Sequence, residues 1–142
     1  PKIFNYVIQL FHDHYQNKDI DVIVGIESRG FIFASPLALK LKRPFALARK
    51  PGKLPSETIN QEYELEYGTD SLEIHKDSIR INDNVLIIDD LLATGGTANA
   101  ALELLKKTGA NISAFLILIE LINLKGRNKI EVQTESLLSF DE

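Results

Sequence analysis

Short apolar runs alternate along the chain with longer segments in which apolar residues recur every three or four positions. The runs at residues 21–26, 84–90 and 112–120 are almost continuously apolar, and residues 45–50 form a further short run. Runs of this length and composition are typical of strands that are buried on both faces of a sheet. The sequence therefore predicts at least four buried strands.

The segments between these strands have the pattern of helices. Apolar residues from Ile3 to Phe11 recur at helical steps, and a second helix is predicted from Gly30 to just before Pro44, with Pro36 in its first turn or at a kink. A third helix is predicted from residue 96 to its stop at Gly109. Because strands alternate with helices, we expect one α/β domain over residues 1–142, with a mainly parallel twisted sheet and helices on both faces.

Residues 51–79 do not fit this alternation. They are polar, contain Gly52, Pro55 and Gly68, and include two stretches in which apolar and polar residues alternate as in a β-hairpin. A long polar hairpin inside a compact α/β domain commonly serves as a lid or binding loop. We therefore expect a flexible flap over about residues 51–79.

The turn between the third predicted strand and the helix after it carries the strongest chemical signal. Two glycines in "ATGGT" (residues 93–97) allow positive φ angles and a close approach of the backbone to a ligand. Consecutive N–H groups at the start of a helix bind anions, which favours a phosphate monoester. Taken alone, the turn fits an ordinary strand-to-helix connection capped by a threonine equally well.

Asp89 and Asp90 precede this turn directly and change its interpretation. Two adjacent carboxylates repel each other beside an apolar core, so a compensating partner is expected. Carboxylates accept hydrogen bonds from sugar hydroxyls and can face Mg²⁺ through water. Acids that bind a sugar, followed by a phosphate-binding turn, would suit a ribose 5-phosphate.

Composition narrows the function classes. The formal net charge of −4 gives no reason to expect nucleic-acid binding, and the chain has no cysteine for disulfide or thiolate chemistry. The apolar runs are shorter than the roughly 20 residues that cross a bilayer, so no membrane partner is expected. The sequence shows no His or Cys residues at the spacing of a dedicated metal site. A cytoplasmic protein is the default expectation.

The string "VLIIDDLLATGGT" resembles the 5-phosphoribosyl 1-diphosphate (PRPP) motif of the type I phosphoribosyltransferases. The strings "GIESRGFIF", "ARKPGKLP", "LEYGTDSLEIHKDSI" and "ELINLKGR" extend the resemblance over nearly the whole chain, in the order found in the adenine-specific branch of that family. The resemblance implies transfer of the phosphoribosyl group from PRPP to adenine, which yields AMP and diphosphate in purine salvage. It also implies a homodimer, and Mg²⁺ bound mainly through PRPP and water.

The resemblance assigns site residues by their position in these strings. The 5-phosphate would bind to Ala93, Thr94, Gly95, Gly96 and Thr97, the ribose hydroxyls to Asp89 and Asp90, and the diphosphate to Ser28, Arg29, Gly30, Arg49, Lys50 and Lys53. It also implies a cis peptide bond before Ser28. On the base side, Leu124 and Tyr67 would contact adenine, and Glu66 in the flap would handle the purine proton as the catalytic residue.

Two alternatives share this sequence evidence. The base could be xanthine, hypoxanthine or guanine, or the domain could be a PRPP sensor in a non-catalytic regulator. The family segment that covers the base ahead of the first helix has no match here. Because the sequence starts at Pro1, we expect a native N-terminal segment that is missing from it. Glu120, at the end of a buried run, is expected either to orient an active-site group or to form a salt bridge.

Overall fold

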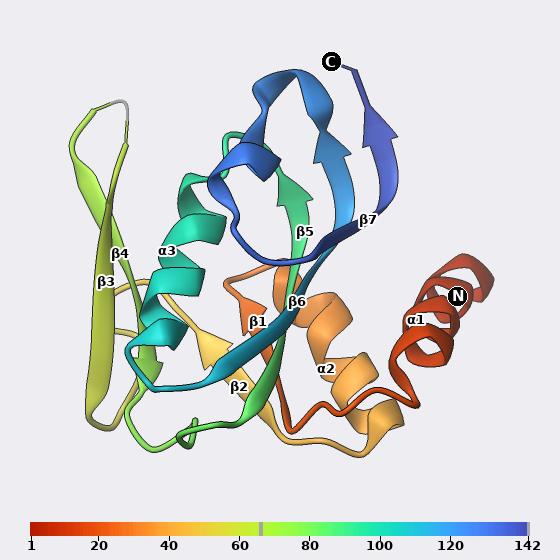
Figure 1. Ribbon diagram of the computed structural model, residues 1–142, viewed down its shortest axis with the longest axis horizontal. Helices are drawn as coiled ribbons and strands as arrows, with labels where there is room; N and C mark the ends of the chain where they lie inside the picture. Colours follow the sequence, from red (N-terminus) through yellow and green to blue (C-terminus); the bar gives the residue numbers. More distant parts are fainter. Residues whose placement is uncertain (66, 142) are drawn as a thin grey trace.

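The computed structural model describes residues 1–65 and 67–141, and its centre is a five-stranded parallel sheet (Figure 1). The strand order is β2 (Phe45–Ala48), β1 (Val22–Ile26), β5 (Asn84–Leu92), β6 (Asn111–Leu121) and β7 (Thr134–Phe140). The helices are α1 (Lys2–Tyr15), α2 (Gly30–Leu41) and α3 (Gly96–Lys106), and η1 (Ile122–Leu124) and η2 (Gly126–Lys129) are short 3-10 helices. The expected α/β class is confirmed. The sequence pattern did not predict β7, because polar residues interrupt its apolar positions.

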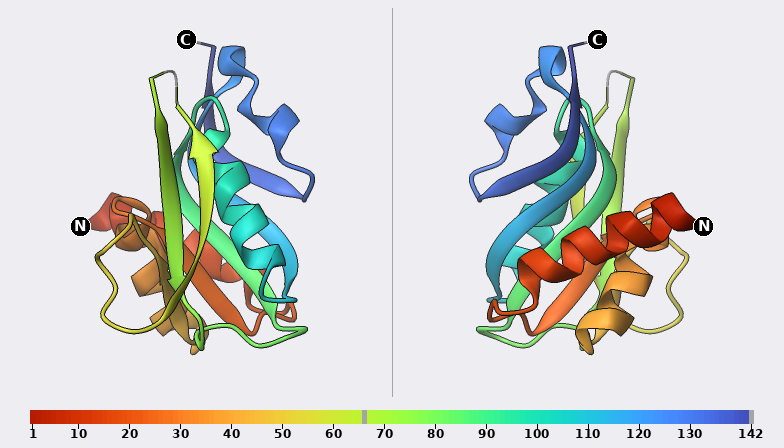
Figure 2. Two further views of the ribbon diagram at one scale, coloured as in Figure 1. Left: turned by 90° about the vertical axis from the view of Figure 1, so that its left-hand side faces the viewer. Right: turned by 90° about the vertical axis from the view of Figure 1, so that its right-hand side faces the viewer.

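Side chains alternate between two apolar clusters on opposite faces of the sheet. Val24, Ile87 and Phe115 belong to the cluster that α3 covers. Ile23, Leu86 and other strand residues belong to the cluster that α1 and α2 cover. The two views in Figure 2 show these faces, with α3 on one side of the sheet and α1 and α2 on the other. Burial on both faces explains why the central strands are continuously apolar.

The polar segment forms an antiparallel hairpin of β3 (Thr58–Glu64) and β4 (Thr69–His75), as predicted. The strands of the hairpin lie beside α3 (Figures 1 and 2). β4 is more buried than the polar sequence of this segment suggested, because Leu72 and Ile74 are fully buried in the cluster that α3 covers. A bridge between Arg49 and Glu73 joins the end of β2 to β4.

The register of the strands creates the space in which a site can form. β1 pairs with β5 only as far as Gly25 and Ile88, whereas β5 continues to Leu92. The predicted strand end at residue 90 was therefore two residues short, because β6 still pairs with β5 up to Leu92. Asp89 and Asp90 lie on this extension, beyond the last residue of β5 that pairs with β1.

The start of α2 is brought to the same edge by close packing. A Cβ atom on Gly25 would lie 2.8 Å from Cβ of Ala34, so the glycine lets α2 lie directly on β1. Pro36 lies within α2 rather than in its first turn. No helix in the described parts of the chain is long and apolar enough to cross a membrane.

Candidate active site

Loops from three strands surround a cavity of about 250 Å³ at the carboxyl edge of the sheet. In open parallel sheets this edge is where ligands bind. Its lining comprises Glu27, Arg29, Lys50, Asp89, Leu91, Leu92, Ala93, Thr94, Gly95, Gly96, Thr97 and Ala98. The structure thus brings together the predicted phosphate turn, one of the two predicted sugar-binding acids and two of the predicted diphosphate-binding cations.

The glycine-rich turn ends in the N-terminus of α3. Gly95 is the N-cap of this helix with φ +89°, and no side chain of the described residues caps the helix. The first N–H groups of a helix have no partner within it, and the helix dipole makes this end positive. The floor of the cavity therefore offers unpaired N–H groups to an anion.

A second glycine from a distant segment holds this turn in place. A Cβ atom on Gly95 would lie 2.5 Å from the carbonyl oxygen of Gly126, and a Cβ on Gly126 would lie 2.3 Å from the carbonyl oxygen of Ala93. The two backbones are therefore in contact at positions where only glycine fits. Sequence reasoning missed Gly126, although its glycine within "NLKGR" is a signal for such an approach.

The paired aspartates have different surroundings. Asp89 lines the cavity and accepts a hydrogen bond of 2.8 Å from the N–H of Asp90. Asp90 forms an ion pair of 2.7 Å with Nε of Arg29. Burial, together with the adjacent Asp90 carboxylate, raises the pKa of Asp89 to about 8. Near neutral pH, Asp89 can therefore carry a proton and both donate and accept hydrogen bonds.

The raised pKa predicts that Asp89→Asn stabilises the protein in a pH-dependent way. The folded protein keeps the proton on Asp89 up to about pH 8, whereas the unfolded chain releases it near the ordinary aspartate pKa of 3.8. Stability of the wild type should thus fall as pH rises between these values. At pH 8 the variant should gain on the order of 5 kcal/mol in free energy of unfolding, because a shift of one pKa unit corresponds to about 1.4 kcal/mol, and at pH 4 almost nothing. Denaturant unfolding at a series of pH values measures this.

Asp90→Asn is the matched control for this prediction. It removes the neighbouring carboxylate but leaves Arg29 without its ion-pair partner, so no gain in stability is expected. An Asp89→Asn variant whose stability gain is the same at pH 4 and pH 8 would contradict the assignment of a raised pKa to Asp89.

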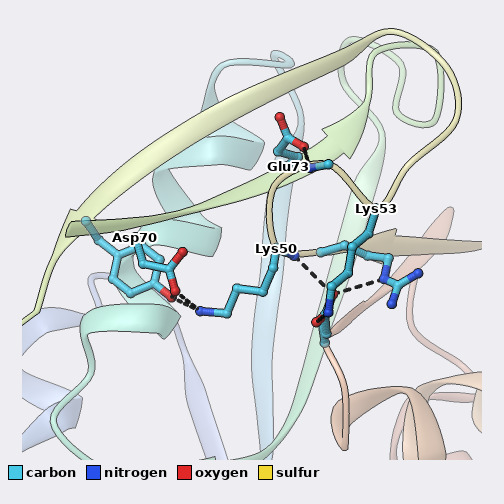
Figure 3. A network of polar contacts seen from close by, with 8 residues as sticks. Lys50, Lys53, Asp70 and Glu73 are labelled. Carbon is cyan, nitrogen blue, oxygen red and sulfur yellow. Dashed lines mark hydrogen bonds and ion pairs between the residues drawn. The ribbon is translucent and has the colours of Figure 1, made fainter. Parts of the chain in front are cut away.

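A basic segment after β2 is tied to the site by Glu27. The Glu27 side chain is only 9% exposed, and it accepts hydrogen bonds of 3.0 Å from Nε of Arg49 and from the N–H of Lys50. Lys53 reaches the same carboxylate (Figure 3). Burial alone would raise the pKa of Glu27, but the contacts with Lys53, Lys50 and Arg49 outweigh it and lower the pKa. Glu27 is a site residue that the sequence did not reveal.

The same segment is also joined to the hairpin. The Lys50 ammonium donates to Asp70 of β4 and to the hydroxyl of Tyr63 on β3 (Figure 3). Glu73 accepts a hydrogen bond of 2.9 Å from the N–H of Gly52. Lys50 therefore lines the cavity while its charge is paired with the hairpin. An anion in the cavity would compete with Asp70 for this ammonium.

The loop between β1 and α2 completes this edge of the cavity. The peptide bond between Glu27 and Ser28 is cis, as the resemblance implied. Ser28 is exposed beside the cavity, and Gly30 is buried at the start of α2. A Cβ atom on Gly30 would lie 2.8 Å from the carbonyl oxygen of Ile88, so the loop is packed directly on β5.

The predicted base-binding residues are not part of this cavity. Leu124, in η1, is 46% exposed, and Tyr67, at the hairpin tip, is 87% exposed. Glu66, the predicted catalytic residue, lies outside the described residues. Arg49 and Lys53 form ion pairs with Glu27, and Asp90 with Arg29. Glu27 and Arg29 line the cavity, whereas their three partners do not. The binding roles of all these residues stay predictions.

The arrangement favours a small phosphorylated ligand with a second anionic group. The lining of the cavity combines the uncapped start of α3, the Asp89 carboxyl group and the cationic side chains of Arg29 and Lys50. Among the residues described, no cluster of three or more His, Cys, Asp or Glu side chains offers a protein cage for a metal. A cation would therefore have to share its ligands with phosphate oxygens and water.

Comparison with known proteins agrees with this arrangement. Residues 1–134 match the family model of the phosphoribosyl transferase domain. An adenine phosphoribosyltransferase from Halothermothrix orenii is 56% identical over 128 residues, which cover 90% of this chain and 75% of that protein.

Two solved structures of adenine phosphoribosyltransferases have the same fold. The enzyme from Thermoanaerobacter pseudethanolicus has 47% identity and a TM-score of 0.94, with 98% of this chain and 81% of that chain covered. The enzyme from Saccharomyces cerevisiae has 44% identity and a TM-score of 0.92, with 97% and 81% covered. The latter was solved with adenine and an imino-altritol bisphosphate.

Proposed function

Because this chain belongs to the phosphoribosyl transferase family, we propose that its cavity binds PRPP and that it transfers the phosphoribosyl group to adenine. The products are AMP and diphosphate, so the activity is one of purine salvage. The observation that carries this proposal is the cavity itself, which joins an uncapped helix start, an aspartate and two cations from three separate segments.

The 5-phosphate is proposed to bind at the start of α3. Residues Ala93, Thr94, Gly95, Gly96 and Thr97 surround this point, and the uncapped N–H groups supply its hydrogen bonds. Asp89 also lines the cavity, and Asp90 follows it in the chain. Both carboxyl groups are proposed to bind the ribose hydroxyls, since carboxylates are good acceptors for them.

The diphosphate is proposed to bind opposite the 5-phosphate. The loop of Ser28, Arg29 and Gly30 would contribute there, with Arg49, Lys50 and Lys53 from the basic segment. Cations at this position stabilise the charge that builds up on the diphosphate as its bond to ribose C1 breaks. Lys50 would exchange its contact with Asp70 for the ligand, which would couple PRPP binding to the hairpin.

The base is proposed to enter between η1 and the hairpin tip. Leu124 would pack on the adenine ring and Tyr67 would lie near it, which requires the flap to move towards the cavity. A closed flap would exclude water, which otherwise hydrolyses PRPP. The adenine ring nitrogen forms the new bond to C1, diphosphate leaves with the electron pair of the old bond, and Glu66 is proposed to take the nitrogen's proton.

Mg²⁺ is proposed as the cofactor. Asp89 and Asp90 suit it as outer partners through water, because the described residues form no cage and the cation prefers phosphate oxygens with several waters. When bound, it would neutralise charge on the diphosphate.

A homodimer is also proposed, and large apolar side chains exposed on α1 and α2, such as Ile3, Tyr6 and Leu39, support it. The cytoplasm is the proposed compartment.

Competition among purines tests the proposal against its alternatives. With PRPP and Mg²⁺, the protein should convert adenine at least about a hundredfold more efficiently than hypoxanthine, guanine or xanthine, because a site that hydrogen-bonds one base rejects a base with a different pattern of donors and acceptors. Preference for another purine would identify a different transferase. Binding of PRPP without turnover of any purine would instead favour a PRPP sensor.

A further inference from the structure

The segment that carries Leu124 is poorly held by apolar packing. None of the residues of η1 is buried, and in η2 only Gly126 is. Ile122 and Leu124 are each 46% exposed. Polar contacts must therefore fix where this segment lies.

Those contacts come from a fork between Glu120 and Arg127. Nε of Arg127 lies 3.0 Å from Oε2 of Glu120, and Nη2 lies 2.6 Å from Oε1. Glu120 is 7% exposed and also accepts a hydrogen bond of 3.0 Å from Ser136 of β7. Arg127 further donates to the carbonyl oxygen of Thr134. The pair therefore closes the connection between β6 and β7 at both of its ends.

The closed connection is placed directly against the phosphate turn. Gly126, next to Arg127, contacts the backbone of Ala93 and Gly95. Two residues earlier, Leu124 lies on the proposed base side. The fork thus fixes the separation between the turn at the start of α3 and the segment that carries Leu124. The Arg127 guanidinium also holds the pKa of Glu120 below its ordinary value, which keeps the pair ionised.

We propose that Glu120 and Arg127 are positioning residues, which set the distance between the 5-phosphate and adenine subsites without touching either ligand. This rests on the proposed function, because it takes the start of α3 and Leu124 as those subsites. Glu120 was expected either to orient an active-site group or to form a salt bridge. The structure shows the salt bridge with Arg127, which in this proposal also orients the segment that carries Leu124.

Binding of AMP and of ribose 5-phosphate separates this role from a general loss of stability. AMP spans both subsites, whereas ribose 5-phosphate occupies only one. In Glu120→Gln the Kd of AMP should rise roughly tenfold, since small misplacements of a binding group are costly. The Kd of ribose 5-phosphate should change by less than about twofold. Titration calorimetry of wild type and variant with each ligand gives the ratio of the AMP Kd to the ribose 5-phosphate Kd.

Two further variants complete the test. Arg127→Lys keeps the charge but loses the two-pronged contact with Glu120. The ratio of its AMP Kd to its ribose 5-phosphate Kd should therefore lie between those of the wild type and Glu120→Gln. If Glu120→Gln does not fold, Arg127→Lys provides the test. Glu135→Gln removes a half-buried carboxylate on β7 that contacts Tyr15 and His14 of α1 instead of the fork, and its ratio should equal that of the wild type.

An unchanged ratio in Glu120→Gln, or an equal loss for both ligands, would overturn the positioning role while leaving the proposed function in place. A wild-type protein that binds neither AMP nor ribose 5-phosphate would overturn the proposed function, and this inference with it.

Discussion

Gly95→Ala is expected to lower kcat/KM for PRPP by two orders of magnitude or more. The new methyl group would lie 2.5 Å from the carbonyl oxygen of Gly126, well inside van der Waals contact, so the turn or the neighbouring segment must move by about 1 Å. A displacement of this size in a positioned binding group costs about a hundredfold. The φ of +89° adds strain of about 1–2 kcal/mol for an alanine. Steady-state kinetics with varied PRPP measures the loss.

Gly109→Ala provides a matched control for backbone strain. Gly109 has a φ of +80° just beyond the end of α3, and the atom nearest to its new methyl group would be in the side chain of Ile81, at 3.2 Å. This variant should lose stability while keeping the kcat/KM of the wild type. If both variants lost activity in proportion to their loss of stability, the close approach of Gly95 and Gly126 would have no specific role in binding phosphate.

Glu66→Gln is expected to have the largest effect on the chemical step. If Glu66 takes the purine proton, its amide replacement should lower kcat by about two to four orders of magnitude, the usual contribution of a general base. PRPP binding should be little changed, because Glu66 is assigned to the base and not to the phosphates. The measurement is kcat for AMP formation, together with the Kd of PRPP.

Glu64→Gln, two residues earlier on β3, is the corresponding control. The Glu64 side chain is exposed at the end of β3, and the substitution removes one negative charge, as Glu66→Gln does. It should retain wild-type turnover. A kcat for Glu66→Gln that matches that of Glu64→Gln would remove Glu66 from its catalytic role.

The parts of the fold that could be predicted from sequence were those that burial determines. β1, β5 and β6 were predicted because both of their faces are covered, which makes them continuously apolar. The junction from Asp89 to Thr97 was recognisable because its chemistry is local, with acids, glycines and a helix start within nine residues.

The remaining parts depend on contacts between residues that are far apart in sequence. Nothing near Glu27 in the chain indicates that it binds Arg49 and Lys53, more than 20 residues away. The contact of Gly126 with Gly95 is likewise visible only once β6 and α3 are placed. The diphosphate-binding role of Lys50 stays a prediction, whereas its pairing with Asp70, 20 residues away on the hairpin, could not be predicted from the sequence.

Phosphorus NMR of one reaction mixture tests the central claim most directly. Wild-type protein with adenine, PRPP and Mg²⁺ should convert the PRPP signals into those of AMP and diphosphate in equal amounts. Without adenine, the PRPP signals should persist, because the cavity binds PRPP but lacks the nucleophile. Failure to form AMP in the complete mixture would contradict the proposed function.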